Sequence, residues 1–354
     1  MRKLSVVLGL LLVFLILGAV GCSSAQNGGE QAKEPVSKEM PKLLNLATTS
    51  VGSGINAMGS GMAVVLNNYL STNTKVVATT GPVEWMPMIM SGEMDLGVLG
   101  SIDAMQAFNS EGAYEKIPGI EKDNIRLLTS GTPANIGLLV TEDSNVKTIE
   151  DLKGKRIGIY YTNNYGATAV ALAGLANLGL TVKDIVPLTF PDPAAGIRAM
   201  IEGRADGGSS SLGMAVAQEL DAGRGARFFS FDPSPEAVKK FKEVLPGVGV
   251  VQIKPSSSAP YVKEPVYVSD YPFYLVGSTK LSEETAYQIV KTLWEQNAEL
   301  SPIHGMLKKW VPDRFIHKDA VVPYHPGAIK FYKEVGVWSQ EMDSHQSKLL
   351  SKKK

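Results

Sequence analysis

Two loops rich in hydroxyl and amide side chains contain residue types that could bind a small anion. The first loop covers residues 48–54 and reads TTSVGSG, and the second covers residues 161–168 and reads YTNNYGAT. Each follows an apolar run that predicts a β-strand and precedes a segment that predicts a helix. Because a helix N-terminus offers unpaired N–H groups and a partial positive charge, both loops suit a carboxylate or phosphate group.

Serine residues extend this predicted site. Ser101 and the run Ser209–Ser211 follow two further predicted strands, and ligands of open α/β sheets bind where strands end. Neither loop contains Arg or Lys, so backbone N–H groups and hydroxyls would hold the anion, and Trp85 and Tyr165 could cover it. The predicted ligand-binding residues are Thr49, Ser50, Gly52, Ser53, Gly54, Trp85, Ser101, Tyr161, Thr162, Asn163, Asn164, Tyr165, Gly166, Thr168, Ser209, Ser210 and Ser211.

Helix capping explains the same residues without a ligand. Ser and Asn are common at helix starts because their side chains accept hydrogen bonds from the first N–H groups. Lone aromatic residues such as Trp85 and Tyr165 are explained equally well by packing. For any single residue capping is the simpler explanation, whereas the matched pair of loops favours a ligand site.

Strand, loop and helix alternate in two parts of the chain. In the first part the apolar pattern predicts strands at 43–47, 75–79 and 96–99 and helices at 55–69 and 83–90. In the second part it predicts strands at 156–160, at 185–188 and from 206, with helices at 167–178 and 194–202. This alternation is typical of a mainly parallel sheet.

The two parts also resemble each other in sequence. The segment SGEMD at 91–95 ends a helix and leads through a strand to Ser101, and EGRAD at 202–206 leads likewise to Ser209. Two lobes of similar plan are the simplest explanation, although short Gly/Asp turns can also coincide by chance.

Further strands predict how the chain passes between the lobes. Strands at 125–129 and 136–141 lead from the first lobe to the second, strands at 266–268 and 274–277 lead back, and helices at 282–297 and 326–335 complete the first lobe. The first lobe is thus predicted to comprise residues 43–136 and 266–340, and the second residues 137–265. A chain that crosses twice leaves a hinge and a cleft, which predicts a two-lobed α/β fold with mixed sheets and helices on both faces.

The N-terminal residues predict export and a lipid anchor. Arg2 and Lys3 precede an apolar run from Leu4 to Val20 that is short for a membrane span, so residues 1–21 are expected to be a signal peptide. LGAVGC at 17–22 resembles the lipobox of bacterial lipoproteins, which places a lipid on Cys22, although Ala19 stands where Leu is usual. The alternative is an ordinary signal peptide cut near Ala19 or Ala25. Residues 22–42 are polar and predict a flexible tether, so the protein is expected on the outer face of the cytoplasmic membrane or in the periplasm.

The composition argues against nucleic acid and anionic lipid as partners and against internal disulfide bonds. The chain of 354 residues has 35 Lys and Arg against 35 Asp and Glu, and this balance argues against nucleic acid or anionic lipid as a partner. Cys22 is the only cysteine, so the body beyond the tether forms no internal disulfide. That body is longer than one hydrophobic core usually covers, which agrees with two lobes.

Enzyme and cofactor signatures are weak. Gly52, Gly54 and Ala57 fit a loose dinucleotide fingerprint, but the second strand ends in threonines and lacks the acidic residue that the fingerprint requires. No G-x-S-x-G segment occurs, and the spacing of the four histidines fits no zinc motif. We therefore expect no enzyme activity, no cofactor and no metal.

Residues from about 43 to 337 resemble the TAXI family of solute-binding proteins of TRAP transporters. The resemblance rests on GSG at 52–54, SGEMDL at 91–96, DLKGKRI at 151–157, HPGAI at 325–329 and YKEVG at 332–336. It departs from the family at 81–85, where GPVEW replaces the frequent GSVEN, and at Asn163-Asn164-Tyr165, where a Gly/Ser-rich stretch is usual.

The resemblance implies a type II periplasmic-binding-protein-like fold that closes on an organic anion. The ligand would be a glutamate-like amino acid or another small carboxylate, and the closed form, a monomer, would deliver it to a permease driven by an ion gradient. A binding protein of an ATP-driven importer or of a sensor kinase would have the same cleft, so the neighbouring genes would decide between these alternatives. An exported α/β enzyme is the remaining alternative.

Overall fold

The computed structural model describes residues 40–257 and 259–351. The predicted signal peptide, Cys22 and most of the predicted tether lie outside these residues. None of the described helices is both long enough and apolar enough to cross a membrane.

The first sheet has the strand order β2-β1-β3-β12-β4. β1 pairs in parallel with β2 and β3, whereas β12 is antiparallel to both β3 and β4, so the sheet is mixed as predicted. Its strands are β1 (Leu43–Thr48), β2 (Asn73–Ala78), β3 (Leu96–Gly100), β4 (Ile125–Pro133) and β12 (Pro272–Ser278). The helices that accompany it in the chain are α1 (Gly54–Tyr69), α2 (Pro82–Ser91), α3 (Ser101–Asn109), α8 (Glu283–Glu295), α9 (Leu300–Ile303), α10 (Pro312–Phe315), α11 (Pro326–Glu334) and α12 (Gln340–Ser351).

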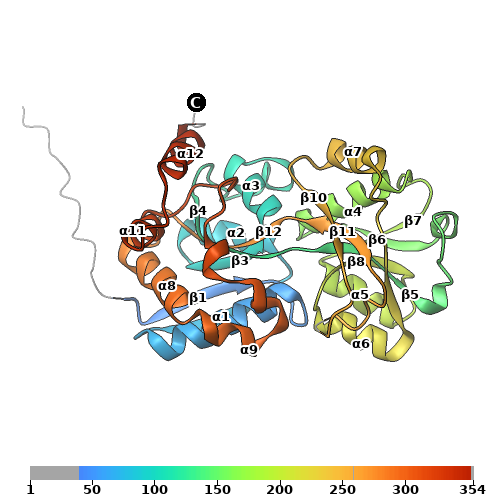
Figure 1. Ribbon diagram of the computed structural model, residues 1–354, viewed down its shortest axis with the longest axis horizontal. Helices are drawn as coiled ribbons and strands as arrows, with labels where there is room; N and C mark the ends of the chain where they lie inside the picture. The colour runs from blue at the N-terminus through green and yellow to red at the C-terminus, as the bar shows by residue number, and fades with distance from the viewer. Residues whose placement is uncertain (1–39, 258, 352–354) are drawn as a thin grey trace, which may run out of the picture. The chain divides into compact units, whose positions relative to one another are not determined.

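The second sheet repeats this plan with the order β7-β6-β8-β5-β9. Its strands lie in the green to yellow part of the chain in Figure 1. β6 is parallel to β7 and β8, and β5 is antiparallel to β8 and β9. Its strands are β5 (Ile136–Thr141), β6 (Arg156–Tyr161), β7 (Val186–Phe190), β8 (Gly207–Ser211) and β9 (Ala226–Phe229), and its helices are α4 (Tyr165–Asn177), α5 (Pro193–Ile201), α6 (Ala215–Arg224) and α7 (Pro235–Val244). Each sheet with its helices is one lobe, so the predicted two-lobed α/β fold is confirmed.

Two chain segments connect the lobes, and they lie side by side. β4 of the first sheet is followed after two residues by β5 of the second, and β11 (Val266–Asp270), which pairs with β10 (Gly249–Ile253), is followed by β12 of the first. The N–H of Ala134 donates to the carbonyl of Tyr271 at 2.6 Å, and the Ser269 hydroxyl donates to the carbonyl of Ile136 at 2.8 Å. The predicted pair of crossings is therefore present.

The repeated Gly/Asp segments have the same structural task in both lobes. Asp95 accepts a hydrogen bond from the N–H of Asn45 in β1 at 2.7 Å, and Asp206 accepts one from the N–H of Arg156 in β6 at 2.9 Å. Gly92 and Gly203 precede them with φ of 83° and 74°, the left-handed conformation that favours glycine. Each segment therefore ends a helix and fastens the next strand to the middle of its sheet.

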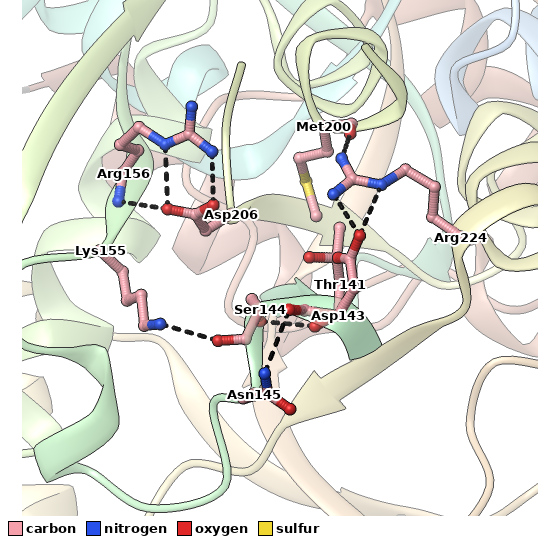
Figure 2. A network of polar contacts seen from close by, with 9 residues as sticks. All are labelled: Thr141, Asp143, Ser144, Asn145, Lys155, Arg156, Met200, Asp206 and Arg224. Atoms are coloured by element: carbon pink, nitrogen blue, oxygen red, sulfur yellow. Dashed lines mark hydrogen bonds and ion pairs between the residues drawn. The ribbon is translucent and has the colours of Figure 1, made fainter. Parts of the chain in front are cut away.

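The segment at 151–157 also has a structural role (Figure 2). The Arg156 guanidinium forms two bonds to the Asp206 carboxylate, at 3.1 and 2.7 Å, and the Lys155 ammonium donates to the carbonyl of Ser144 at 2.7 Å. Asp151 accepts from the N–H groups of Lys147 and Thr148, at 3.0 and 2.8 Å. These bonds fix the turn before β6.

The HPGA segment joins α11 to α8. His325 is the N-cap of α11, and its Nδ1 accepts from the N–H of Gly327 at 3.2 Å while its Nε2 lies 3.0 Å from the carbonyl of Leu281. A Cβ on Gly327 would lie 2.1 Å from the carbonyl oxygen of Glu283, so only glycine fits there. Burial lowers the pKa of His325 to about 4, and the ring is therefore neutral.

Candidate functional site

A small pocket lies where the carboxyl ends of the parallel strands in both sheets meet the helix N-termini of both lobes. The space open to the centre of a water molecule is about 40 Å³, which suits a compact solute of a few heavy atoms. Four helix starts contribute to it, those of α1, α3, α4 and α5, together with the end of β8 and residues of the two crossings. Its lining consists of Thr49, Ser53, Gly54, Ile55, Gly100, Asp103, Ile136, Asn164, Ala167, Asp192, Pro193, Ala194, Ser209, Ser210, Ser211, Met214, Tyr271 and Phe273.

The first predicted loop meets the pocket at the start of α1. Ser53 is the N-cap, and its hydroxyl accepts from the N–H of Asn56 at 3.1 Å and lies 2.6 Å from the hydroxyl of Thr49. A Cβ on Gly54 would lie 2.3 Å from the sulfur of Met306 and 3.2 Å from the Ser211 hydroxyl, so the backbone here approaches its neighbours closely. The loop thus presents hydroxyls and helix N–H groups to the pocket.

The second predicted loop divides its residues between the pocket and the packing below it. Asn164 lines the pocket and caps α4, with its side-chain oxygen accepting from the N–H of Ala167 at 3.1 Å. Tyr161 lies beneath, where its hydroxyl donates to the carbonyl of Gly158 at 2.9 Å and accepts from the N–H of Ser209 at 2.7 Å. Burial raises the pKa of Tyr161 to about 12. Tyr161 therefore supports the loop and β8.

Predicted site residues fall into three groups. Those that line the pocket are Thr49, Ser53, Gly54, Asn164, Ser209, Ser210 and Ser211. Those that form hydrogen bonds between the lobes are Ser50, Gly52, Asn163 and Gly166. Those in neither group are Trp85, Ser101, Tyr161, Thr162, Tyr165 and Thr168.

Trp85 is a core residue in this conformation and does not cover the pocket. Its side chain is 0% exposed, and a Cβ on Gly97 of β3 would lie 2.5 Å from the indole ring. The missing side chain at Gly97 leaves the space that the ring fills. Tyr165, which is only partly buried, is likewise absent from the pocket lining.

The lobes contact each other around the pocket. The Ser50 hydroxyl donates to the Asp192 carboxylate, and the Arg198 guanidinium donates to the carbonyl of Val51 at 2.6 Å. Asn163 uses both its side chain and its carbonyl: its amide donates to the Thr80 hydroxyl at 2.5 Å, and its carbonyl accepts from the N–H of Val83 at 3.3 Å. The cleft between the lobes is therefore closed over the pocket.

At Gly81 the backbones of the two lobes meet without a side chain between them. A Cβ on Gly81 of the first lobe would lie 1.9 Å from the carbonyl oxygen of Asn163 in the second. The N–H of Val83 donates to the same carbonyl and completes the contact. Backbone from one lobe thus rests directly on backbone from the other.

Two acidic side chains in the lining were not among the predicted site residues. Asp103, in the first turn of α3, is 2% exposed and accepts from the Tyr114 hydroxyl at 2.8 Å and from the N–H of Gly166 at 3.0 Å. Asp192 is the N-cap of α5 and accepts from the N–H of Ala195 at 2.7 Å. Both carboxylates are buried at helix starts, those of α3 and α5, whereas the predicted anion-binding loops precede α1 and α4.

The local sequence gives a stronger signal for the position of Asp192 than for that of Asp103. Asp192 precedes Pro193, and Asp followed by Pro is a helix-start signal, so a capping analysis could have placed it at a helix N-terminus. Asp103 lies four residues beyond the predicted strand at 96–99, but its approach to α4 depends on how the lobes meet. Tyr271 also lines the pocket, and its position depends on the return crossing.

The described residues contain no group of three or more His, Cys, Asp or Glu side chains that could hold a metal ion. The chemistry available in the pocket is hydrogen bonding from hydroxyls and N–H groups, together with the charge of two carboxylates. No lysine, arginine or histidine is part of the pocket lining.

Two lobes with the same strand order, joined by adjacent crossings and closed over a small pocket, define the two-lobed fold of periplasmic binding proteins. The model of the NMT1-like family matches residues 46–336, and the chain belongs to that family.

Several solved structures are similar to this chain at low sequence identity. MatC from Rhodopseudomonas palustris with bound malate superposes with a TM-score of 0.54 and 11% identity, covering 87% of this chain and 99% of that one. PhnD1 from Prochlorococcus marinus in complex with methylphosphonate gives a TM-score of 0.48 and 12% identity, covering 84% and 100%. The alkanesulfonate-binding protein SsuA from Xanthomonas axonopodis pv. citri, bound to MOPS, gives 0.46 and 19%, covering 86% and 83%.

Proposed function

We propose that this protein is an extracytoplasmic solute-binding protein of the TAXI type, which captures a small solute carrying a carboxylate group and delivers it to a TRAP-type permease. The pocket at the meeting point of both lobes is the observation that carries the proposal, since it combines helix N-termini with a cluster of hydroxyls. The protein acts as a binding protein and not as an enzyme. In the full chain, the signal peptide directs export and a lipid on Cys22 keeps the protein at the membrane.

Binding and closure are linked in this proposal. The hydrogen bonds between the lobes form only when the cleft is shut, and a solute that contacts both lobes adds to them. Such a solute shifts the population from open to closed by its difference in affinity for the two states. The permease then distinguishes a loaded protein from an empty one by the relative position of the lobes.

A thermal-shift screen of small carboxylates and amino acids tests the proposal, because a ligand that binds only the folded state stabilises it. At a ligand concentration a hundredfold above Kd, the added stability is about 2.7 kcal/mol. A carboxylate-bearing solute is expected to raise the melting temperature. If only neutral compounds raise the melting temperature, the proposal that the ligand carries a carboxylate is wrong. If no compound raises it, the proposed binding role is wrong.

The Ser211→Ala variant connects such binding to the pocket. Ser211 ends β8 and lines the pocket, so loss of its hydroxyl is expected to weaken the best solute by about threefold to tenfold, the usual value of one hydrogen bond. Ser347→Ala, on the exposed side of α12, is the matched control and is expected to leave Kd unchanged. Isothermal titration calorimetry measures both. Equal affinities in the two variants would mean that the solute binds outside the pocket that Ser211 lines.

A further inference from the structure

The charged groups of the pocket lining are both acidic. Asp103 comes from the first lobe and Asp192 from the second, and each is at most 2% exposed. A buried charge normally has a partner of opposite sign, because its transfer from water is costly. The cavity that these carboxylates face has no such partner within its lining.

Asp103 has acceptor capacity left after its bonds within the protein. Its two hydrogen-bond donors, the Tyr114 hydroxyl and the N–H of Gly166, are neutral groups, and each carboxylate oxygen receives one of them. A carboxylate offers about four acceptor positions, so further donors can be accommodated. Burial without a cation raises the pKa of Asp103 to about 6, which shows how poorly the protein alone compensates its charge.

A second polar group in the cavity also lacks a partner. Tyr271 is 6% exposed and lines the pocket, and its hydroxyl has no hydrogen bond within residues 40–257 and 259–351. Its ring lies over Gly100, where a Cβ would be 2.8 Å from the ring and 3.6 Å from the hydroxyl. Burial, together with the negative charge of Asp103, raises the pKa of Tyr271. A hydroxyl without a hydrogen-bond partner thus lines the same pocket as a buried carboxylate without a cation.

We propose that Asp103 is a specificity-determining residue that binds an ammonium group of the solute, with the Tyr271 hydroxyl completing the contact. The solute carboxylate then lies toward the start of α1 and the serines of β8. This inference rests on the proposed function and narrows it. The pocket takes amino acids and rejects the corresponding acids that lack the amino group, because those acids would bring a second uncompensated negative charge beside Asp103.

Matched pairs of compounds test this specificity in the wild-type protein. We would compare L-glutamate with glutarate and L-alanine with propionate by isothermal titration calorimetry at pH 7.5. In at least one pair the amino acid is expected to bind roughly tenfold or more tightly than its counterpart, as a charge-assisted hydrogen bond allows. An equal or tighter Kd for the acids overturns the inference but leaves the proposed function intact. Absence of binding by every compound overturns both.

Asp103→Asn locates the preference at this residue. Asparagine keeps an oxygen for the N–H of Gly166 but has no charge, so the amino acid is expected to lose its advantage while the acid binds as before or more tightly. Asp95→Asn is the control, since Asp95 also accepts a backbone hydrogen bond in the first lobe but does not line this pocket. An unchanged preference in Asp103→Asn overturns the assignment.

The pH dependence of solute affinity distinguishes a binding role of Asp103 from a merely structural one. An ammonium group binds the ionised carboxylate, so wild-type affinity for the amino acid is expected to fall as the pH decreases from 7.5 to 5 and Asp103 becomes protonated. The Asp103→Asn variant is expected to show a flat profile over this range. Wild-type affinity that stays constant or rises on acidification overturns the inference.

Discussion

His325 couples folding to pH through a single buried ring. Its folded-state pKa is about 4 against an ordinary value of 6.5, so the unfolded chain binds this proton more readily. Stability from His325 is therefore complete above about pH 6.5 and is lost as the pH falls toward 4. The shift corresponds to roughly 3 kcal/mol. Urea denaturation at pH 7 and pH 4.5 should show a smaller acid loss in His325→Asn, whose side chain can still cap α11, than in the wild type.

Asp103 contributes to the pH dependence with the opposite sign. Its pKa is raised from 3.8 to about 6, so the folded protein holds this proton more tightly, and the associated stability is lost as the pH rises through 6. Asp103 is present in both His325→Asn and the wild type, so its contribution to the pH dependence of stability cancels when the two proteins are compared. An equal acid loss in both proteins would contradict the assignment of the neutral ring at position 325.

Residue types in the sequence identified those site groups that come directly after strands. Ser53, Asn164 and Ser209 line the pocket, and their place was predictable because a hydroxyl or amide before a helix, or at a strand end, is a local signal. Asp103 was not predicted, since its contact with Gly166 joins segments 63 residues apart. The placement of Trp85 depends on the space beside Gly97, which no spacing along the chain predicts.

At the scale of elements, Asp206 is expected to anchor β6 to β8 mainly through the backbone. The carboxylate accepts from the N–H of Arg156, and the guanidinium that also contacts it is partly exposed, so the ion pair itself adds little. Asp206→Ala is expected to lower the free energy of unfolding by about 1–2 kcal/mol because a strand N–H loses its acceptor. Asp206→Asn, which keeps an acceptor oxygen, should cost less. Chemical denaturation measures both.

Asp143 offers the control for that experiment. It forms an ion pair with Arg224 in the same region of the second lobe (Figure 2). Its side chain is half exposed. Breaking an exposed pair costs no more than about 1 kcal/mol, so Asp143→Ala should be the milder change. If Asp143→Ala and Asp206→Ala lower the free energy of unfolding equally, the hydrogen bond from the N–H of Arg156 to Asp206 is not the main stabilising contact of Asp206.

Elements with a strong apolar period were predictable, and polar or short ones were not. The run from Ile55 to Leu66 places its apolar residues on one buried face, and the observed α1 matches it. The predicted strand at 75–79 begins two residues earlier, at Asn73, because β2 pairs in register with β1 from Leu43. The segments that form α6, α7, β9 and β10 were not predicted, since their position depends on the completed second sheet.

At the scale of the molecule, the closed state depends on bonds that cross the cleft without touching the solute. Arg198 of α5 is exposed and donates to the carbonyl of Val51 in the first lobe. Arg198→Ala is expected to weaken solute binding by about threefold, because the apparent Kd scales inversely with the fraction of protein able to close. Dissociation should become faster while association changes little, which stopped-flow or surface plasmon resonance measurements can separate.

Arg204 serves as the matched variant for this prediction. It is an exposed arginine of the same lobe, and its ion pair is to Glu202 just before it in the chain, so its loss leaves the cleft contacts intact. Arg204→Ala should therefore bind and release the solute as the wild type does. Equal effects in the two variants would mean that the general loss of positive charge, and not the bond across the cleft, sets affinity. A selective effect of Arg198→Ala would make closure itself part of the binding energy, because Arg198 lies outside the pocket lining.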